Sequence, residues 1–414
     1  MSAHVFGESA GSILPDEPYA TYLKWRSTGP LCWREEFFGG AWVLTTYEGV
    51  QAALRDPRFS ARRTGGWVMN TAPRGSAERE ELLGLQRVFS RAMLFVDKPA
   101  HPRLRQAMQS GFRPAAIHSL QPFITSVIEE LLDEIDHATA PGESFDFIAH
   151  FARHVPARVI ARLLGLENTH NEQFIEWSAG IARFLGSARP TLEETRRAQT
   201  CLLAVSAYFE RTLASGEYRE RDDLLGVLAR AAAAGEIEEG AELLAQCAML
   251  LFAGYETTRH LLGTSIYWVL RKPGAWEQLQ SDPTLVRGAV RELLRWDGPI
   301  QYTGRRVKTD VSLYGQTLRR GDLVLALIGA ANRDPAEYEA PDELRLNRQV
   351  GMPLSFGVGV HACIGANLTL SEAEVTLGAI LRRWPALRLA EEKPGWIQSP
   401  LYRGLVTLPL VARG

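Results

Sequence analysis

Residues 356–365 read Phe-Gly-Val-Gly-Val-His-Ala-Cys-Ile-Gly, so a single cysteine, Cys363, stands inside a glycine-rich turn. Gly357, Gly359 and Gly365 permit positive φ angles and close approach of the backbone to a flat partner. The residues that follow have the composition of a helix. A cysteine just before a helix N-terminus meets free backbone N–H groups and the positive end of the helix dipole, which favours its thiolate. A thiolate in such a turn suits an axial ligand of haem iron.

Two other interpretations of this cysteine stay open on the residues alone. A lone cysteine in a loop is most often a buried thiol. A zinc site would need several ligands at suitable spacing, but only His361 is near, and Cys201 and Cys247 fall in other helical stretches.

The composition is that of a large protein without a strong global charge. The chain has 414 residues and a formal net charge of −2, so the overall balance gives no indication of nucleic acid as a partner. Length alone would allow two or three domains, but no Gly/Ser-rich or Pro-rich linker divides the chain. We therefore expect one domain over residues 1–414, with an irregular tail over about residues 1–15.

The N-terminal segment carries acidic side chains and no apolar run, which argues against a signal peptide or a membrane anchor. The few cysteines are widely spaced, so they do not form a disulfide framework and indicate a reducing compartment. We expect a soluble, cytoplasmic protein that works without a membrane.

The longest helical pattern runs from about Glu239 to Leu270 and contains no proline. Its apolar residues lie almost all round the helix, which predicts burial inside the protein. A membrane-spanning interpretation fails because Glu256, Arg259 and His260 would lie inside the bilayer at high cost.

The middle of this helix reads Ala-Gly-Tyr-Glu-Thr-Thr over residues 253–258. A glycine, an acid and a hydroxyl are locally unfavourable in a buried helix, and such conflicts are expected at functional sites. Gly254 and Thr257 are three residues apart, so the glycine would open a space into which the hydroxyl can donate. Glu256 offers a proton source. The alternative is a kinked helix whose threonine bonds to its own backbone.

His101 and Arg105 are four residues apart on a predicted helix that starts near Pro102, so they share one face and could together hold an anion. The alternative is a solvated helix face. Residues 61–93 show only weak periodicity and predict a long loop, which is usually functional or disordered. A strand hairpin is predicted around residues 39–40, and a second, terminal hairpin over residues 396–410.

Taken in order, these motifs resemble the cytochrome P450 family. The turn matches the family's haem-binding signature, in which six fixed residue types fall in register. The resemblance implies that Cys363 is the proximal thiolate ligand of haem b, with Gly357 and Gly365 shaping the loop. It also implies that Phe356 packs near the sulfur and that His361 lies beside a haem propionate.

The helix motif resembles the family's oxygen-activation motif. This implies that Ala253 and Gly254 border the haem, that Thr257 hydrogen-bonds dioxygen and that Glu256 relays protons. Tyr255 stands where a histidine is common.

The resemblance also implies that His101 and Arg105 bind the haem propionates. Arg305 is expected to reach a propionate as well; the adjacent Arg306 is the alternative, and the spacing to Asp310 favours Arg305.

Glu292-Leu-Leu-Arg295 resembles the family's Glu-x-x-Arg helix, whose pair locks onto an arginine further along the chain. Arg345 is the expected partner and Arg348 the alternative. Asn332-Arg-Asp-Pro335 matches a turn of the family. The role of these motifs would be to support the haem core.

The resemblance covers about residues 16–411. It implies a mainly α fold with a small β-region (α+β), a single triangular prism around buried haem. The implied activity is haem-thiolate monooxygenation: O2 is activated and a hydrophobic organic substrate, an intermediate of secondary metabolism, is hydroxylated. Electrons would come ultimately from NAD(P)H through a ferredoxin reductase and a ferredoxin, which would dock on a basic face with Arg103 and Arg113. We expect a monomer.

Two alternatives to hydroxylation remain. One is oxidative coupling or cyclisation without net oxygen insertion. The other is a haem-thiolate sensor, against which the intact acid–alcohol pair argues. The expected substrate pocket is apolar and is formed by Trp67, Met69, Met93, Leu94, Phe184, Ile300, Gln301 and Leu401.

Overall fold

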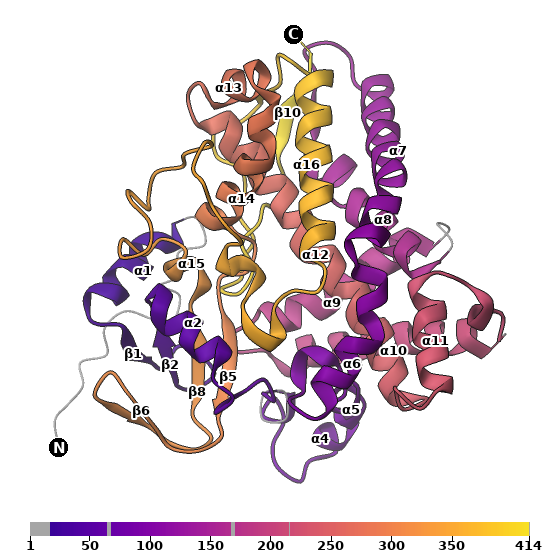
Figure 1. The fold of residues 1–414 in the computed structure, drawn as a ribbon, viewed down its shortest axis with the longest axis vertical. Coiled ribbons are helices and arrows are strands. Elements are labelled where there is room, and N and C mark those ends of the chain that lie inside the picture. Colours follow the sequence, from indigo (N-terminus) through magenta and orange to yellow (C-terminus); the bar gives the residue numbers. More distant parts are fainter. Residues whose placement is uncertain (1–16, 64–67, 167–169, 215, 414) are drawn as a thin grey trace.

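The computed structural model describes residues 17–63, 68–166, 170–214 and 216–413 (Figure 1). The predicted N-terminal tail and Trp67 lie outside the described residues. Helices dominate the rest, and the larger sheet occupies one corner of the molecule, at the lower left of Figure 1.

The α-helices are α1 (Pro18–Ser27), α2 (Tyr47–Arg55), α4 (Ala77–Glu81), α5 (Leu83–Phe89), α6 (Ala100–Gln109), α7 (Pro114–Ala138), α8 (His154–Leu164), α9 (Asn171–Gly186), α10 (Leu192–Ala214), α11 (Leu224–Ala233), α12 (Ala241–Arg271), α13 (Ala275–Ser281), α14 (Val286–Asp297), α15 (Ile328–Ala331) and α16 (Ala366–Arg383). The strands are β1 (Leu31–Arg34), β2 (Ala41–Leu44), β3 (Phe59–Ser60), β4 (Ser144–Asp146), β5 (Thr303–Val307), β6 (Val311–Leu313), β7 (Gln316–Leu318), β8 (Leu323–Ala326), β9 (Arg388–Leu389) and β10 (Pro409–Val411).

Helix α12 forms the axis of the helical part. It is packed by α8, α9 and α10 and also by α14 and α16. This explains why its apolar residues continue round the helix instead of forming one stripe. The prediction of a long buried helix over residues 239–270 is therefore confirmed. Among the described residues, no helix combines the length and the apolar composition that crossing a bilayer requires.

The larger sheet has the order β1-β2-β8-β5-β3, with β2 and β8 parallel and the other neighbours antiparallel. The predicted hairpin around residues 39–40 is the β1–β2 pair, in which Leu31 lies opposite Leu44. This sheet places β5, with Arg305, beside β8 in the interior of the protein.

Two predictions about secondary structure are wrong. Part of the predicted loop over residues 61–93 is helical, because α4 and α5 cover residues 77–89, and Ser76 caps α4 by accepting a hydrogen bond from the Arg79 amide at 3.3 Å. The terminal hairpin over residues 396–410 is not formed. Instead β10 pairs with β4 and β9, and Trp396 meets Leu405 in a single bridge.

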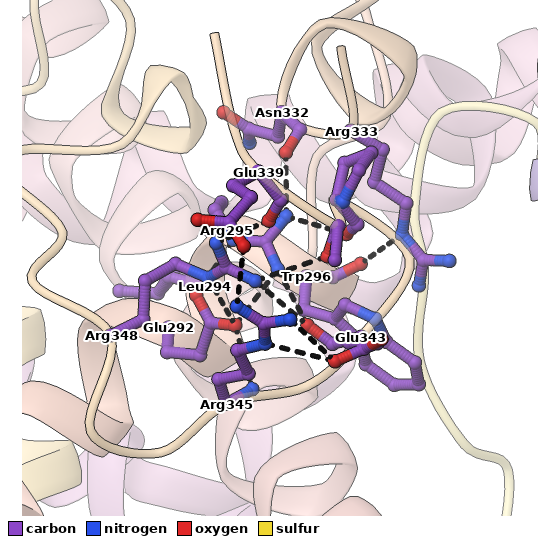
Figure 2. Close-up of polar contacts among 12 residues, drawn as sticks. Glu292, Leu294, Arg295, Trp296, Asn332, Arg333, Glu339, Glu343, Arg345 and Arg348 are labelled. Carbon is purple, nitrogen blue, oxygen red and sulfur yellow. Dashed lines mark hydrogen bonds and ion pairs between the residues drawn. The ribbon is translucent and has the colours of Figure 1, made fainter. Parts of the chain in front are cut away.

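A buried ion-pair network supports the loop that carries the cysteine (Figure 2). Glu292 accepts two hydrogen bonds from Arg295, at 2.6 and 2.8 Å, and both side chains are fully buried. The third member is Arg348, whose Nε lies 3.1 Å from Glu292 Oε1. The expectation that Arg345 would fill this place is wrong: its side chain pairs with Glu343, and only its backbone N–H reaches Glu292.

The network reaches the cysteine loop through Asn332. Arg295 donates to the Asn332 carbonyl oxygen at 2.8 Å. The Asn332 side chain then donates to Ser355 Oγ at 2.9 Å and accepts from the Leu354 amide at 3.2 Å. The chain is thus fixed directly before Phe356, where the turn towards Cys363 begins.

Candidate active site

A cavity of about 550 Å³ lies between the middle of α12, the cysteine loop and the chain around β5. It is the point at which most of the predicted site residues meet. Those that border it are His101, Arg105, Ala253, Glu256, Thr257, Arg305, Phe356, Gly357, His361 and Cys363.

The cysteine loop is held by its own backbone. The Cys363 amide donates to the Phe356 carbonyl oxygen at 2.7 Å, which closes the turn. Gly357 and Gly359 have φ angles of 67° and 78°, in the region that favours glycine. A Cβ on Gly359 would also lie 2.9 Å from the Leu54 carbonyl oxygen, so this close approach to α2 needs a glycine.

The Cys363 thiol faces the cavity from inside the protein. Its accessible surface belongs to the cavity wall, so the sulfur is enclosed by protein yet reachable from within. Burial raises the pKa of the thiol, while the Gly365 amide and the Arg105 charge lower it. A metal cation bound at the sulfur would reverse this balance, because coordination removes the thiol proton.

One end of the cavity collects cationic and imidazole side chains. The rings of His101 and His361 lie 4.0 Å apart between centroids. Burial and the Arg105 charge lower the pKa of His101 to about 4, and burial together with His101 lowers the pKa of His361 to about 3. Both rings are therefore neutral near pH 7. Arg305 is only 5% exposed and borders the cavity, whereas Arg306 also borders it but donates to the Gly321 carbonyl oxygen.

Arg63 joins this group and was not predicted. Burial and the Arg305 charge lower its pKa to about 9, and its guanidinium lies 4.8 Å from the centre of the Phe95 ring. The sequence offered only an Arg-Arg pair in a weakly patterned stretch, which does not distinguish a buried arginine from an exposed one.

This cationic end fits the carboxylates of a haem. Within the described part of the chain Arg63 and Arg305 form no ion pair, and the buried His101 Nε2 has no hydrogen-bond partner. Asp97, the acid that acts on Arg305, is bonded to Ser60 and Lys308. Buried charges normally carry a counter-charge, so the arrangement suits an anionic group in the cavity.

The opposite wall is the central turn of α12. Thr257 Oγ1 donates to the Ala253 carbonyl oxygen at 3.2 Å, which is the backbone-bonded alternative considered for this residue, yet Thr257 also borders the cavity. Glu256 is 3% exposed and is ion-paired with Arg259 at 2.9 Å.

Among the residues that the structure describes, the predicted Gly254 and Gly365 do not border the cavity. A Cβ on Gly254 would lie 2.8 Å from Ile160 Cδ1, so this glycine lets α12 approach α8 and does not open a space beside Thr257. Gly365 lies at the start of α16, and a Cβ there would lie 3.8 Å from Phe112.

The residues predicted for a substrate pocket divide into two groups. Met93, Leu94, Ile300 and Leu401 border the cavity. Met69, Phe184 and Gln301 do not, among the described residues, and each has a place elsewhere. Met69 belongs to the buried core, Phe184 stacks on Phe89 at 6.1 Å, and the Gln301 amide donates to the Gly298 carbonyl oxygen at 2.8 Å.

Several wall residues were missed. Leu185 borders the cavity in place of its neighbour Phe184. On α12, Met249 and Phe252 precede Glu256 by seven and four residues and share its face. That helical spacing was readable and could have extended the predicted wall by two turns.

Fold and site together define a class: a mainly helical protein with a buried cavity, a cysteine loop at one wall and an acid–alcohol pair at another. The family model "Cytochrome P450" matches residues 72–409. The chain therefore belongs to the cytochrome P450 family and is a P450 monooxygenase, a class that uses haem, O2 and electrons from a redox partner.

The relatives agree over nearly the whole chain. The biotin biosynthesis cytochrome P450 of Bacillus subtilis is 31% identical over 412 residues, covering 98% of this chain and 99% of the relative. The mycinamicin IV hydroxylase/epoxidase of Micromonospora griseorubida is 35% identical over 375 residues, covering 90% and 89%. The crystal structure of P450BioI in complex with hexadec-9Z-enoic acid ligated acyl carrier protein superposes with a TM-score of 0.87 at 29% identity, covering 97% of this chain and 99% of that one.

Proposed function

We propose that the protein hydroxylates a hydrophobic organic substrate that is an intermediate of secondary metabolism. The observation that carries the proposal is that the Cys363 thiol, the cationic end and Thr257 border one cavity. The remaining wall is mostly apolar, with Met93, Ile300 and Leu401 among its residues, which favours an apolar substrate. The relative named as a hydroxylase/epoxidase supports oxygen insertion as the outcome.

In this proposal each group of residues has one task. Cys363 is the thiolate ligand of the haem iron, and His101, Arg105, Arg305 and His361 hold the propionates, with Arg63 added to them. Phe356 and Gly357 shape the wall beside the sulfur. When bound, the haem supplies the reductive activation of dioxygen.

The proton path is assigned to α12. Thr257 would break its hydrogen bond to the Ala253 carbonyl oxygen and donate into the cavity. Glu256 would then supply a proton to the Thr257 hydroxyl. Ala253 borders the cavity on the same turn and leaves room for a small molecule.

The partners remain those expected from the sequence. Electrons would come from NAD(P)H through a ferredoxin reductase and a ferredoxin, to a monomeric, single-domain protein in the cytoplasm. Of the two arginines expected on the docking face, Arg113 is exposed, whereas Arg103 pairs with Glu242 at 2.7 Å. We therefore assign the docking role to Arg113 and not to Arg103.

The first test is the carbon monoxide difference spectrum of the reduced protein and of Cys363→Ser. The wild type should show the strongly red-shifted band of thiolate ligation, and the variant should lose it. Product analysis under ¹⁸O-labelled dioxygen then separates the outcomes. One labelled oxygen in the product supports hydroxylation, whereas loss of two hydrogens without label would replace it by coupling or cyclisation. A spectrum typical of histidine ligation in the wild type would overturn the assignment of Cys363.

A further inference from the structure

The carboxylate of Glu256 is held on one side only. Its Oε2 accepts from Arg259 Nε at 3.2 Å and from Arg259 Nη2 at 2.9 Å. His260 Nε2 lies 3.4 Å from the same oxygen. Within the described residues Oε1 accepts no hydrogen bond, although Glu256 borders the cavity. The two oxygens of this acid therefore have different environments: one faces the helix, and the other is available to the cavity.

His260 fixes the arginine in place. Arg259 Nη2 lies 3.3 Å from His260 Nε2, and because a guanidinium can only donate, this contact is a hydrogen bond in the tautomer whose Nε2 accepts. The ring proton is then on Nδ1, which is buried and has no partner among the described residues. Burial and the Arg259 charge lower the pKa of His260 well below its usual value, so the ring stays neutral.

The ring of His260 packs closely against the C-terminal segment. Its Nδ1 side faces Gly404, where a Cβ would lie only 1.9 Å from the nitrogen. Tyr402 covers it at 6.0 Å between ring centroids. A buried donor without a partner destabilises the fold. Among the described residues Nδ1 is the unpartnered atom, whereas Nε2 accepts the hydrogen bond from Arg259.

The guanidinium is the counter-charge of the acid. Two other titratable side chains interact electrostatically with Glu256: Tyr255 on the same helix and Tyr402 in the C-terminal segment. Burial raises the pKa of both tyrosines, so both are neutral. Arg153 and Glu172 act on Tyr255 from the surface and are paired with each other at 2.6 Å. In the described interior around Glu256, the positive charge in contact with it is that of Arg259.

We propose that Arg259 is a positioning residue for Glu256: it holds Oε2 against the helix, supplies the counter-charge of the carboxylate, and leaves Oε1 as the oxygen that faces the cavity. His260 holds the guanidinium in place. The functional half of this inference rests on the proposed proton path through Glu256. The geometric half does not, because the charge state of a carboxyl can be measured without turnover.

The geometric half is tested by infrared spectroscopy of the haem-loaded protein near neutral pH. Arg259→Met removes the counter-charge, so Glu256 should take up a proton and add a carboxylic-acid band. The band should be absent from the double variant Arg259→Met/Glu256→Gln, which subtracts every other carboxyl in the protein. Arg259→Lys, which keeps the charge, should lack it as well. If the single and double variants give the same spectrum, Arg259 does not set the charge of Glu256 and the proposal fails.

The functional half is tested on oxygen reduction, which needs no organic substrate. With electrons from a surrogate ferredoxin and its reductase, the protein reduces O2 either to H2O2 with two electrons and two protons, or to water with four of each. A positioned acid contributes about 10²-fold or more to proton transfer, so losing its position should raise the ratio of peroxide to water by about tenfold. Arg259→Met and Glu256→Gln should each show this rise, and the double variant should show no more than either alone, because one residue acts through the other.

The control is Arg158→Gln, which removes an arginine of α8 that pairs at the surface with Glu130 and Glu134. It should leave the ratio unchanged, and Arg259→Lys should restore part of the wild-type ratio. Additive effects of Arg259→Met and Glu256→Gln would overturn the proposal. If Glu256→Gln itself has no effect while the wild type still shows the thiolate spectrum, the proposed proton path is wrong, a result distinct from failure of the infrared test.

Discussion

Replacing Arg348 with alanine should destabilise the protein far more than replacing Arg345, although the two arginines are three residues apart in one irregular segment. Arg348 Nε bonds to the fully buried Glu292, and its other nitrogens donate to backbone carbonyl oxygens at 2.7, 3.1 and 3.3 Å. Its side chain is 11% exposed. Arg345 is 37% exposed and pairs with Glu339 and Glu343, which are themselves exposed.

The magnitudes follow from burial. Removing one member of a buried pair costs about 3–5 kcal/mol when the other charge is left unpaired, whereas an exposed pair contributes about 0–1 kcal/mol. Arg348→Ala should lie at the low end of the first range, because Glu292 keeps its two bonds to Arg295. We expect Arg348→Ala to lose about 3 kcal/mol more than Arg345→Ala. Arg348→Lys should fall between the two, since a single ammonium cannot replace a planar guanidinium that donates in several directions.

The assay is urea unfolding of the haem-saturated variants at equal haem concentration, because bound ligand adds to apparent stability. The unfolding midpoints should rank wild type and Arg345→Ala together, then Arg348→Lys, then Arg348→Ala. Equal losses for the two alanine variants, or a loss below about 1 kcal/mol for Arg348→Ala, would refute the reasoning from burial.

Three further predictions concern the cavity and the buried histidine behind α12. Gly404→Ala should lose about 1–3 kcal/mol of unfolding free energy, because the new methyl group overlaps His260 Nδ1; an unchanged urea midpoint would contradict this. Thr257→Ala should keep its haem spectrum but release more peroxide per electron, and full coupling would remove Thr257 from the proton path. The haem-free protein should lose stability as pH falls from about 6.5 towards 4. In this range His101 becomes protonated in the unfolded chain but stays neutral in the folded protein, where its pKa is about 4. His101→Gln should flatten that part of the pH–stability curve, and an identical slope would exclude His101 as its source.

Features that depend on local spacing were readable from the sequence. The cysteine turn needs glycines at fixed positions, and the structure has Gly357 and Gly359 at positive φ. The long helix needs only an unbroken apolar pattern, and its bounds agree with the prediction to within a few residues. In both cases neighbours along the chain determine the outcome.

Features that depend on the rotation of a helix or the path of a loop were not readable. Phe184 and Leu185 are both apolar and adjacent, but successive residues of a helix point about 100° apart and meet different neighbours. Leu185 borders the cavity, whereas Phe184 stacks on Phe89. The choice between Arg345 and Arg348 depends on how the segment after α15 turns back towards α14. Nothing in the composition of that segment favours either arginine.

The role of Arg259 depends on burial, which the sequence does not show. Its charge served only to exclude a membrane-spanning helix, because the spacing to Glu256 is the ordinary three-residue spacing of a surface pair. Such a pair contributes little when exposed. Only the burial of Glu256, at 3% exposure, turns the same spacing into the control of a carboxylate beside a cavity.

The two ends of the cavity therefore differ in net charge. At one end Arg63 and Arg305 carry positive charge with no ion pair among the described residues. At α12 the negative charge of Glu256 is cancelled locally by Arg259. Because the field of a compact ion pair falls off faster than that of a single charge, the cationic end dominates the electrostatics of the cavity. A flat, carboxylate-bearing group would be drawn by its charge towards Arg305, and Thr257 would border the space beside it.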